Sequence, residues 1–67
     1  MIRINVNSRT VELVSTMNID KFLLVHNHDP EKVVISVNNT ILQPADYPKT
    51  FLYDGDRLEL MAFIGGG

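Results

Sequence analysis

The chain has 67 residues, a formal net charge of −2 and no cysteine. Its length allows one small domain with little room for a deep catalytic cleft, and the lack of cysteine excludes disulfides, thiolate metal ligands and a cysteine nucleophile. The six Lys and Arg residues are scattered along the chain and form no basic stripe, which argues against nucleic acid as a partner.

The chain shows no signal for export or membrane insertion. Residues 1–6 lack the long apolar core of a signal peptide. No later segment approaches the ~20 apolar residues that a membrane-spanning helix needs. We therefore expect a soluble cytoplasmic protein with no membrane partner.

Two strands joined by a turn are expected first. Ile2, Ile4 and Val6 alternate with polar residues, which is the period of a strand with one buried face. Residues 7–9 are turn formers, and apolar residues alternate again over residues 10–13. The sequence therefore predicts a β-hairpin.

A short helix follows, because the apolar spacing over residues 17–26 changes to a helical period. Asn18 suits the N-cap, and Asp20 lies in the first turn, where the helix dipole favours a negative charge. Met17 is expected to pack on the helix as a hydrophobic staple. Residues 27–30 are predicted to end the helix, because Pro30 disfavours helical geometry in the residue before it.

A second strand pair is expected after the helix. Residues 32–37 form a strand with alternate apolar residues on one face, and residues 40–42 form a short return strand. The Asn38–Asn39 pair can adopt the left-handed angles that a tight hairpin turn requires. Residues 44–48 are irregular, with a single helical turn as one interpretation, and Tyr47 is expected to anchor them on the core.

The last strand is expected over residues 57–64, after a turn at residues 53–56 in which Gly55 is available for a positive φ. Its alternation predicts two faces. The core face holds Leu58, Leu60, Ala62 and Ile64, and the solvent face holds Arg57, Glu59, Met61 and Phe63.

Three apolar side chains are out of place on the solvent side of the predicted sheet. Met61 and Phe63 lie there in the last strand, and Val34 lies off the core face of the third strand. The element order ββαβββ predicts an α+β domain in which a mixed sheet wraps around one helix and leaves its other face open. We interpret this open face as a partner-binding surface.

The chain ends in a glycine run that suggests its chemistry. We expect a folded domain over residues 1–64 and a flexible glycine tail over residues 65–67. Gly65 and Gly66 would serve as a lead that threads a narrow channel, because they carry no Cβ atoms. A carboxylate at Gly67 is ionised at neutral pH and is a poor electrophile, so a partner must activate it, for example as an acyl-adenylate.

Other candidate sites are weaker. His26 and His28 would diverge on a helix, and no third metal ligand lies nearby in the sequence, so we predict no metal site. Asp54 and Asp56 flank Gly55 and suit a turn better than acid–base catalysis. The chain lacks a glycine-rich phosphate loop, so another protein must bind any ATP.

Several segments together resemble the thiamine-biosynthesis sulfur carrier family, whose members are ubiquitin-like β-grasp proteins. The resemblance covers nearly the whole chain and is carried by residues 51–60 and 63–67, and its most specific parts are the Asp54-Gly55-Asp56 turn and the terminal glycines at this separation. Residues 33–42 resemble the strand-turn-strand of that family. Asn39 stands where the family usually has Gly, and Tyr47 stands where Trp is frequent.

The resemblance implies a mechanism in which the protein is a co-substrate and not an enzyme. A ubiquitin-activating-like adenylating enzyme would use ATP to convert the Gly67 carboxylate to an acyl-adenylate. Sulfur that originates from cysteine through a desulfurase would replace AMP and leave a thiocarboxylate at Gly67. That group would donate sulfur to thiazole synthase, and the carrier itself would bind no cofactor.

Three alternatives remain open. The small subunit of molybdopterin synthase has the same fold and also ends in Gly-Gly. A ubiquitin-like modifier would attach the same carboxylate to lysines. The third alternative is a plain interaction module with an inert tail.

Overall fold

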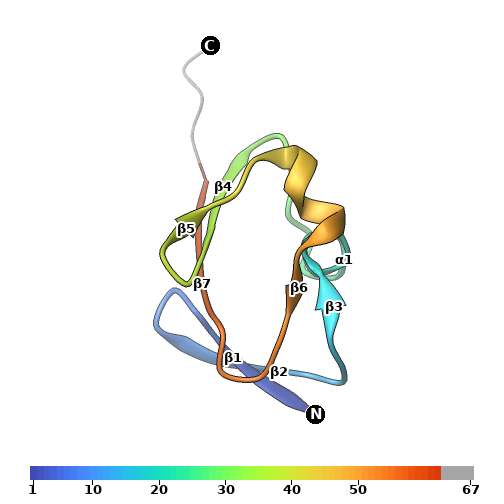
Figure 1. Cartoon of the computed structure of the whole chain (residues 1–67), viewed down its shortest axis with the longest axis vertical. Helices are drawn as coiled ribbons and strands as arrows, with labels where there is room; N and C mark the ends of the chain where they lie inside the picture. The colour runs from blue at the N-terminus through green and yellow to red at the C-terminus, as the bar shows by residue number, and fades with distance from the viewer. Residues whose placement is uncertain (63–67) are drawn as a thin grey trace.

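The computed structural model describes residues 1–62, so Phe63, Ile64 and the three closing glycines lie outside the described residues and their assignments stay predictions. In the ribbon view the elements surround the centre of the domain (Figure 1), and the core side chains fill this space. Their order is β1 (Ile2–Val6), β2 (Arg9–Leu13), β3 (Met17–Asn18), α1 (Ile19–Val25), β4 (Val33–Val37), β5 (Thr40–Ile41), η1 (Pro44–Lys49), β6 (Phe51–Leu52) and β7 (Arg57–Ala62).

Two hairpins form because their turn residues accept left-handed backbone angles. Asn7 and Ser8 connect β1 to β2 with φ values of 50° and 71°, and Asn38 and Asn39 connect β4 to β5 with 50° and 70°. A two-residue turn with both central φ angles positive matches the twist of the flanking strands. Both predicted hairpins are confirmed.

Helix α1 begins where the sequence predicts. The Asn18 side chain accepts a hydrogen bond from the Lys21 backbone N–H at 2.9 Å, and Asp20 lies in the first turn. The helix buries Ile19, Phe22 and Leu23 on one face. The predicted N-cap is therefore confirmed.

Helix α1 ends at its C-cap His26, next to the segment predicted to end it, but the cause is Asn27 rather than Pro30. Asn27 adopts φ 60°, and its N–H donates to the Leu24 carbonyl at 3.3 Å. The N–H of His28 donates to the Leu23 carbonyl at 2.8 Å, which completes a Schellman motif. Asn27 ends the helix before Pro30. Its left-handed conformation turns the chain, so that the N–H groups of Asn27 and His28 bond to the last carbonyls of the helix.

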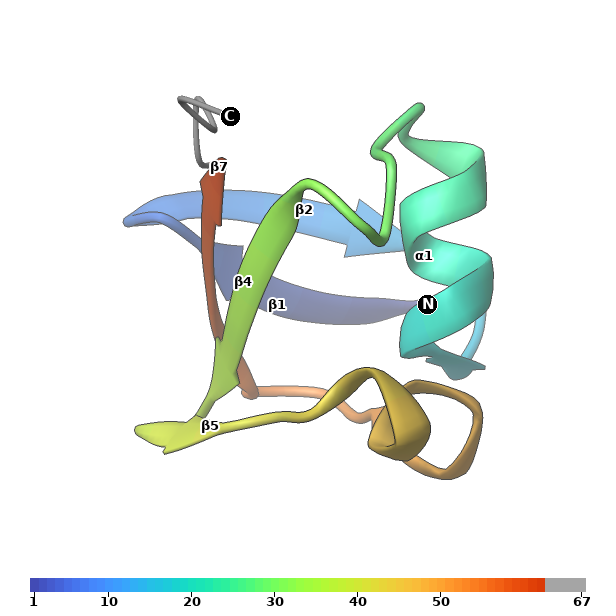
Figure 2. The ribbon, with the colours of Figure 1, turned by 90° about the horizontal axis from the view of Figure 1, so that it is seen from above.

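The main sheet has five strands in the order β2-β1-β7-β4-β5. Strand β1 pairs with β7 in parallel, and the other pairs are antiparallel. Helix α1 lies on one side of this sheet (Figure 2). Between them lies a core in which Leu58 and Ile35 are fully buried. The predicted α+β fold with a mixed sheet around one helix is confirmed.

A second sheet was not predicted. Strands β3 and β6 pair antiparallel, with Met17 opposite Leu52 and Asn18 opposite Phe51. Each strand has two residues, too short to show a period of two in the sequence. Met17, which we expected only as a staple on the helix, therefore belongs to a strand. The segment between β5 and β6 forms the 3₁₀ helix η1 and buries Tyr47, as predicted.

Strand β7 follows the predicted alternation in its first half. Leu58 is fully buried and Leu60 is half-buried, whereas Glu59 and Met61 are exposed. Ala62 is exposed, although the alternation placed it on the core face. It pairs with Val33 at the beginning of β4, which is itself buried.

The described part of the chain contains no helix that is both long enough and apolar enough to cross a membrane.

The Schellman motif gives a first prediction. Asn27→Ala should lower the free energy of unfolding by about 1 kcal/mol, because alanine pays the full cost of the left-handed region. Asn27→Gly should equal or exceed the wild type, since glycine adopts that region freely. Urea denaturation at neutral pH measures both variants. Equal stabilities of the Ala and Gly variants would contradict this account of the helix end.

Candidate functional site

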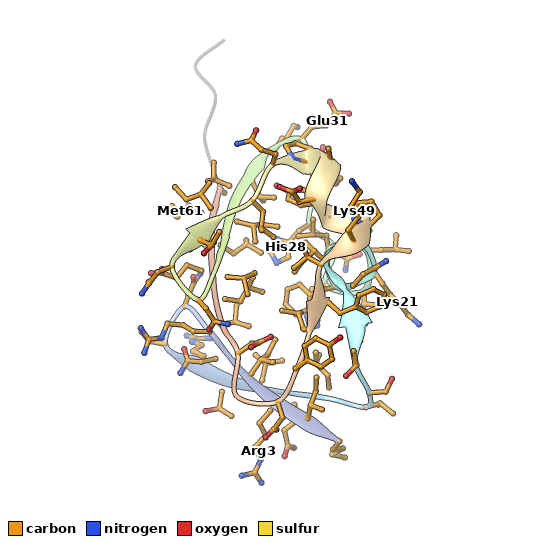
Figure 3. All side chains as sticks on the ribbon, in the orientation of Figure 1. Arg3, Lys21, His28, Glu31, Lys49 and Met61 are labelled. Atoms are coloured by element: carbon orange, nitrogen blue, oxygen red, sulfur yellow. The ribbon has the colours of Figure 1, made fainter. Side chains whose placement is uncertain are left out.

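Val34 and Met61 lie directly opposite each other in the antiparallel β4–β7 pair. Their side chains therefore share one face of the sheet. Met61 is 56% exposed, and Val34 is half-buried. Met61 and Lys21 of α1 lie on opposite sides of the molecule (Figure 3). The structure thus brings together two of the three predicted apolar contact residues, on the open face and near the end of β7.

Ile41 extends this apolar surface and was missed in the sequence. It pairs with Ser36 and is 64% exposed, on the same face as Val34. A two-residue turn at Asn38–Asn39 sets this register, so the turn itself carried the signal that Ile41 faces away from the core. We call Val34, Ile41 and Met61 the apolar patch.

A hollow adjoins the apolar patch at the sheet edge. Its lining is mainly apolar and includes Val33, Leu42, Pro44 and Tyr47 together with Val34 and Ile41 of the patch. Glu31 and Gln43 add polar groups to it. The hollow gives the patch depth, so that a partner side chain can be enclosed rather than laid on a flat surface.

The other half of the open face is charged. Arg3 and Glu12 form an ion pair at 3.0 Å across β1 and β2, with both side chains well exposed. Arg57 and Glu59 continue the polar surface along β7. Exposed pairs of this kind contribute little stability. Arg3 lies at the far end of the molecule from Met61 (Figure 3), whereas Glu59 lies two residues before Met61 on the same face, so the charged and apolar parts meet along β7.

Tyr47 forms part of the hollow and of the core at once. Its side chain is 2% exposed. Burial raises the pKa of the Tyr47 phenol above its ordinary value of 10.0, and the negative charge of Asp20 raises it further. The phenol therefore stays protonated through the physiological range.

The two histidines have structural contacts at the helix end. The His26 ring packs against Phe22 with ring centroids 4.4 Å apart, and the His28 N–H closes the Schellman motif. Within residues 1–62, no three potential ligands are grouped in a way that could hold a metal ion.

Asp54 and Asp56 organise the turn before β7. Asp54 accepts a hydrogen bond from the Arg3 N–H at 2.8 Å. Asp56 accepts one from the Tyr53 N–H at 2.8 Å and one from the Asn38 side-chain amide at 3.1 Å. Gly55 between them has φ 89°. The predicted turn assignment of both acids is confirmed.

Comparison with known proteins identifies the family. The ThiS family matches residues 2–67, which is nearly the entire chain. The chain belongs to the ThiS family. The crystal structure of the thiamine biosynthesis protein ThiS from Geobacter metallireducens has a TM-score of 0.86 at 25% identity, and the match covers 98% of this chain and 100% of that one. An NMR solution structure of a thiamine biosynthesis protein from the same organism has a TM-score of 0.80 at 28% identity, with 98% and 88% covered.

Two curated relatives are also similar to this ThiS family member. A thiazole synthase from Paramagnetospirillum magneticum is 32% identical over 62 residues, which cover 92% of this chain and 19% of that protein. The chain thus spans about a fifth of the length of this relative. An uncharacterized protein, ycf40, from Porphyra purpurea is 24% identical over 98% of this chain and 93% of its own length.

These matches confirm the predicted resemblance to the thiamine-biosynthesis sulfur carriers and their ubiquitin-like β-grasp fold. They do not test the roles predicted for individual residues. Val34 and Met61 are placed by the structure, whereas Phe63, Gly65, Gly66 and Gly67 lie outside its described part.

The buried phenol gives a second prediction. Because the folded protein holds the Tyr47 pKa above its unfolded value of about 10, this group should stabilise the fold below that pH and lose its contribution as the pH rises above it. Tyr47→Phe should show a shallower loss of stability at alkaline pH than the wild type. Urea midpoints between about pH 8 and 11 measure this difference. Parallel curves for the two proteins would exclude a raised phenol pKa.

Proposed function

We propose that this chain is a sulfur carrier of thiamine biosynthesis that acts through a carboxylate at Gly67. The main support is the ThiS family match over residues 2–67, which includes the closing glycines. The apolar patch provides further support, because it lies beside the strand that leads toward those glycines. A carrier needs a recognition surface and a reactive group, but it needs no catalytic cleft of its own.

The proposed chemistry begins with activation of the carboxylate. In an adenylating partner, a carboxylate oxygen of Gly67 attacks the α-phosphorus of ATP, and pyrophosphate leaves. The resulting acyl-adenylate is an electrophile that the free carboxylate is not. A desulfurase transfers the sulfur of cysteine to a carrier thiol as a persulfide, whose terminal sulfur attacks the carbonyl carbon while the bond to AMP breaks. A second thiol then attacks the outer sulfur of the resulting acyl disulfide, so that the two thiols end as a disulfide and the sulfur on the carbonyl is released with two electrons. The product is a thiocarboxylate.

The proposed acceptor is thiazole synthase. The similarity to the Paramagnetospirillum magneticum thiazole synthase supports this choice. About a fifth of that protein is a region similar to this chain. In the proposed pathway, the thiocarboxylate gives its sulfur to thiazole synthase and Gly67 returns to a carboxylate. ATP serves the activating partner and is not a resident cofactor of the carrier.

In the proposed binding mode, the folded domain binds the partner and the glycine tail reaches its active site. The apolar patch and Phe63 would hold the partner, and Gly65 and Gly66 would lead into its active site. Only Gly67 would carry chemistry. The apolar patch can supply an anchor, because its Met and Ile side chains are large and bury substantial apolar area when a partner covers them.

Intact mass spectrometry tests the proposed chemistry. The protein is incubated with an adenylating enzyme of the ubiquitin-activating class, ATP, cysteine and a cysteine desulfurase. We expect a mass gain equal to the difference between sulfur and oxygen, lost again when thiazole synthase and its other substrates are added. Deletion of Gly67 should abolish the gain without changing thermal stability, because we expect a terminal glycine to lie outside the core.

Other outcomes of this experiment identify the alternatives. Conjugates of higher mass on lysines would indicate a ubiquitin-like modifier. If the thiocarboxylate transfers its sulfur to a molybdopterin synthase large subunit and not to thiazole synthase, the chain is the small subunit of molybdopterin synthase. If the mass stays unchanged with every activating enzyme, the result contradicts the proposal and favours the third alternative, an interaction module with an inert tail.

A matched pair of variants tests the apolar patch. Met61→Asp should raise the KM of the adenylating enzyme for the carrier about tenfold or more, because a carboxylate would be buried in the interface. Thr10→Asp places the same charge on the same sheet face in β2, away from the patch, and should leave KM within about twofold. Urea denaturation controls for stability. Equal effects of the two variants on KM would exclude the patch as the docking surface.

A further inference from the structure

The side chain of Asn7 makes an unusual contact with β7. Its Oδ1 accepts a hydrogen bond from the Leu60 backbone N–H at 2.9 Å, and its Nδ2 donates to the Leu60 carbonyl at 3.0 Å. One amide side chain therefore satisfies both backbone groups of one strand residue. A neighbouring strand normally supplies these two bonds.

This contact extends the pairing between β1 and β7 beyond the end of β1. The parallel ladder pairs Asn5 with Arg57 and Val6 with Leu58. The Asn7 N–H then donates to the Leu58 carbonyl at 3.0 Å, and the chain turns away into the hairpin. The Asn7 side chain takes the place that the next residue of a longer β1 would occupy.

Leu60 is consequently the last position of β7 held from the β1 side, within the part of the chain that the structure describes. On the other side, β4 continues to pair with β7 as far as Val33 opposite Ala62. Beyond Leu60 the strand is thus held along one edge only. Asn7 marks the point from which the strand proceeds toward the closing glycines with a single neighbour.

Asn38 makes a comparable contact at the other end of β7. It occupies the same position of the other hairpin turn, with the same φ of 50°. Its Oδ1 accepts from the Arg57 N–H at 2.9 Å, and its Nδ2 donates to Asp56 at 3.1 Å. The two asparagines therefore fasten β7 from opposite sides, Asn38 at its beginning and Asn7 near its end.

We propose that Asn7 is a positioning residue for the transfer chemistry, which fixes the direction in which β7 leaves the sheet and so presents the Gly67 carboxylate to the adenylating partner. This inference rests on the proposed function. Asn7 touches no reacting atom and acts through Leu60. Loss of this contact would change the direction of the strand that precedes the closing residues, and a misplacement of about 1 Å at a reacting group can cost about a hundredfold in rate.

A simpler explanation is that Asn7 serves only its turn, because asparagine is favoured at a left-handed φ. Glycine separates the two explanations. It adopts φ 50° without strain and keeps the turn, but it removes both bonds to Leu60. Asn38→Gly likewise keeps the other turn and removes two side-chain hydrogen bonds, those to Arg57 and Asp56. It is therefore a matched control for stability.

The experiment compares wild type, Asn7→Gly and Asn38→Gly as the full 67-residue chain. Amide hydrogen exchange is measured by NMR, and steady-state kinetics are measured with the adenylating enzyme. We expect similar urea midpoints for the two variants and faster exchange of the Leu60 amide only in Asn7→Gly. We also expect Asn7→Gly to lower kcat about tenfold or more, with a KM close to that of wild type, because the apolar patch is intact. Asn38→Gly should keep both constants.

The possible failures are distinguishable. Equal kcat values for the two glycine variants would overturn the positioning role while leaving the sulfur-carrier proposal in place. A rise in KM rather than a fall in kcat would overturn it too, because it would assign Asn7 to docking. Wild-type protein that is never adenylated would contradict the proposed function instead. In that case an unchanged exchange rate of the Leu60 amide in Asn7→Gly would still show that the Asn7 side chain does not hold Leu60, and would overturn the inference.

Discussion

The pairing of β7 with β1 on one side and β4 on the other is the interaction on which the sheet depends. The remaining pairs of the main sheet only join β1 to β2 and β4 to β5. Without β7 the sheet becomes two separate hairpins, and an isolated hairpin is marginally stable at best. The burial of Leu58 holds the strand on the core, and the apolar patch exists because this pairing places Met61 opposite Val34.

Features that depend on local chemistry could be predicted from the sequence. The alternation of Ile2, Ile4 and Val6, the Asn18 cap and the Asn38–Asn39 turn each follow from a few adjacent residues. Features that depend on distant contacts could not. Strands β3 and β6 exist because Met17 and Leu52 are brought together by the packing around α1. The sequence prediction attributed the end of α1 to Pro30, whereas the left-handed Asn27 ends it three residues earlier.

The candidate site shows the same division. Alternation alone placed Val34 and Met61 on the open face, but only the register of β4 against β7 shows that they are neighbours. Ile41 was within reach of sequence reasoning through its turn, and the hollow beside it was not, because residues of β4, β5 and η1 line it together. The need to activate a carboxylate at Gly67 follows from the chemistry of that group, whereas the thiocarboxylate and its acceptor come from the resemblance.

The long sequence separation between β1 and β7 also affects when the domain can fold. Asn5 pairs with Arg57, so the centre of the sheet cannot close until nearly all of the described chain is available. A nascent or truncated chain that lacks β7 has no neighbour for Val34 and no apolar patch. A partner that binds across Val34 and Met61 therefore selects chains whose last described strand is in place, and recognition of the surface doubles as a test that the carrier is complete up to that strand.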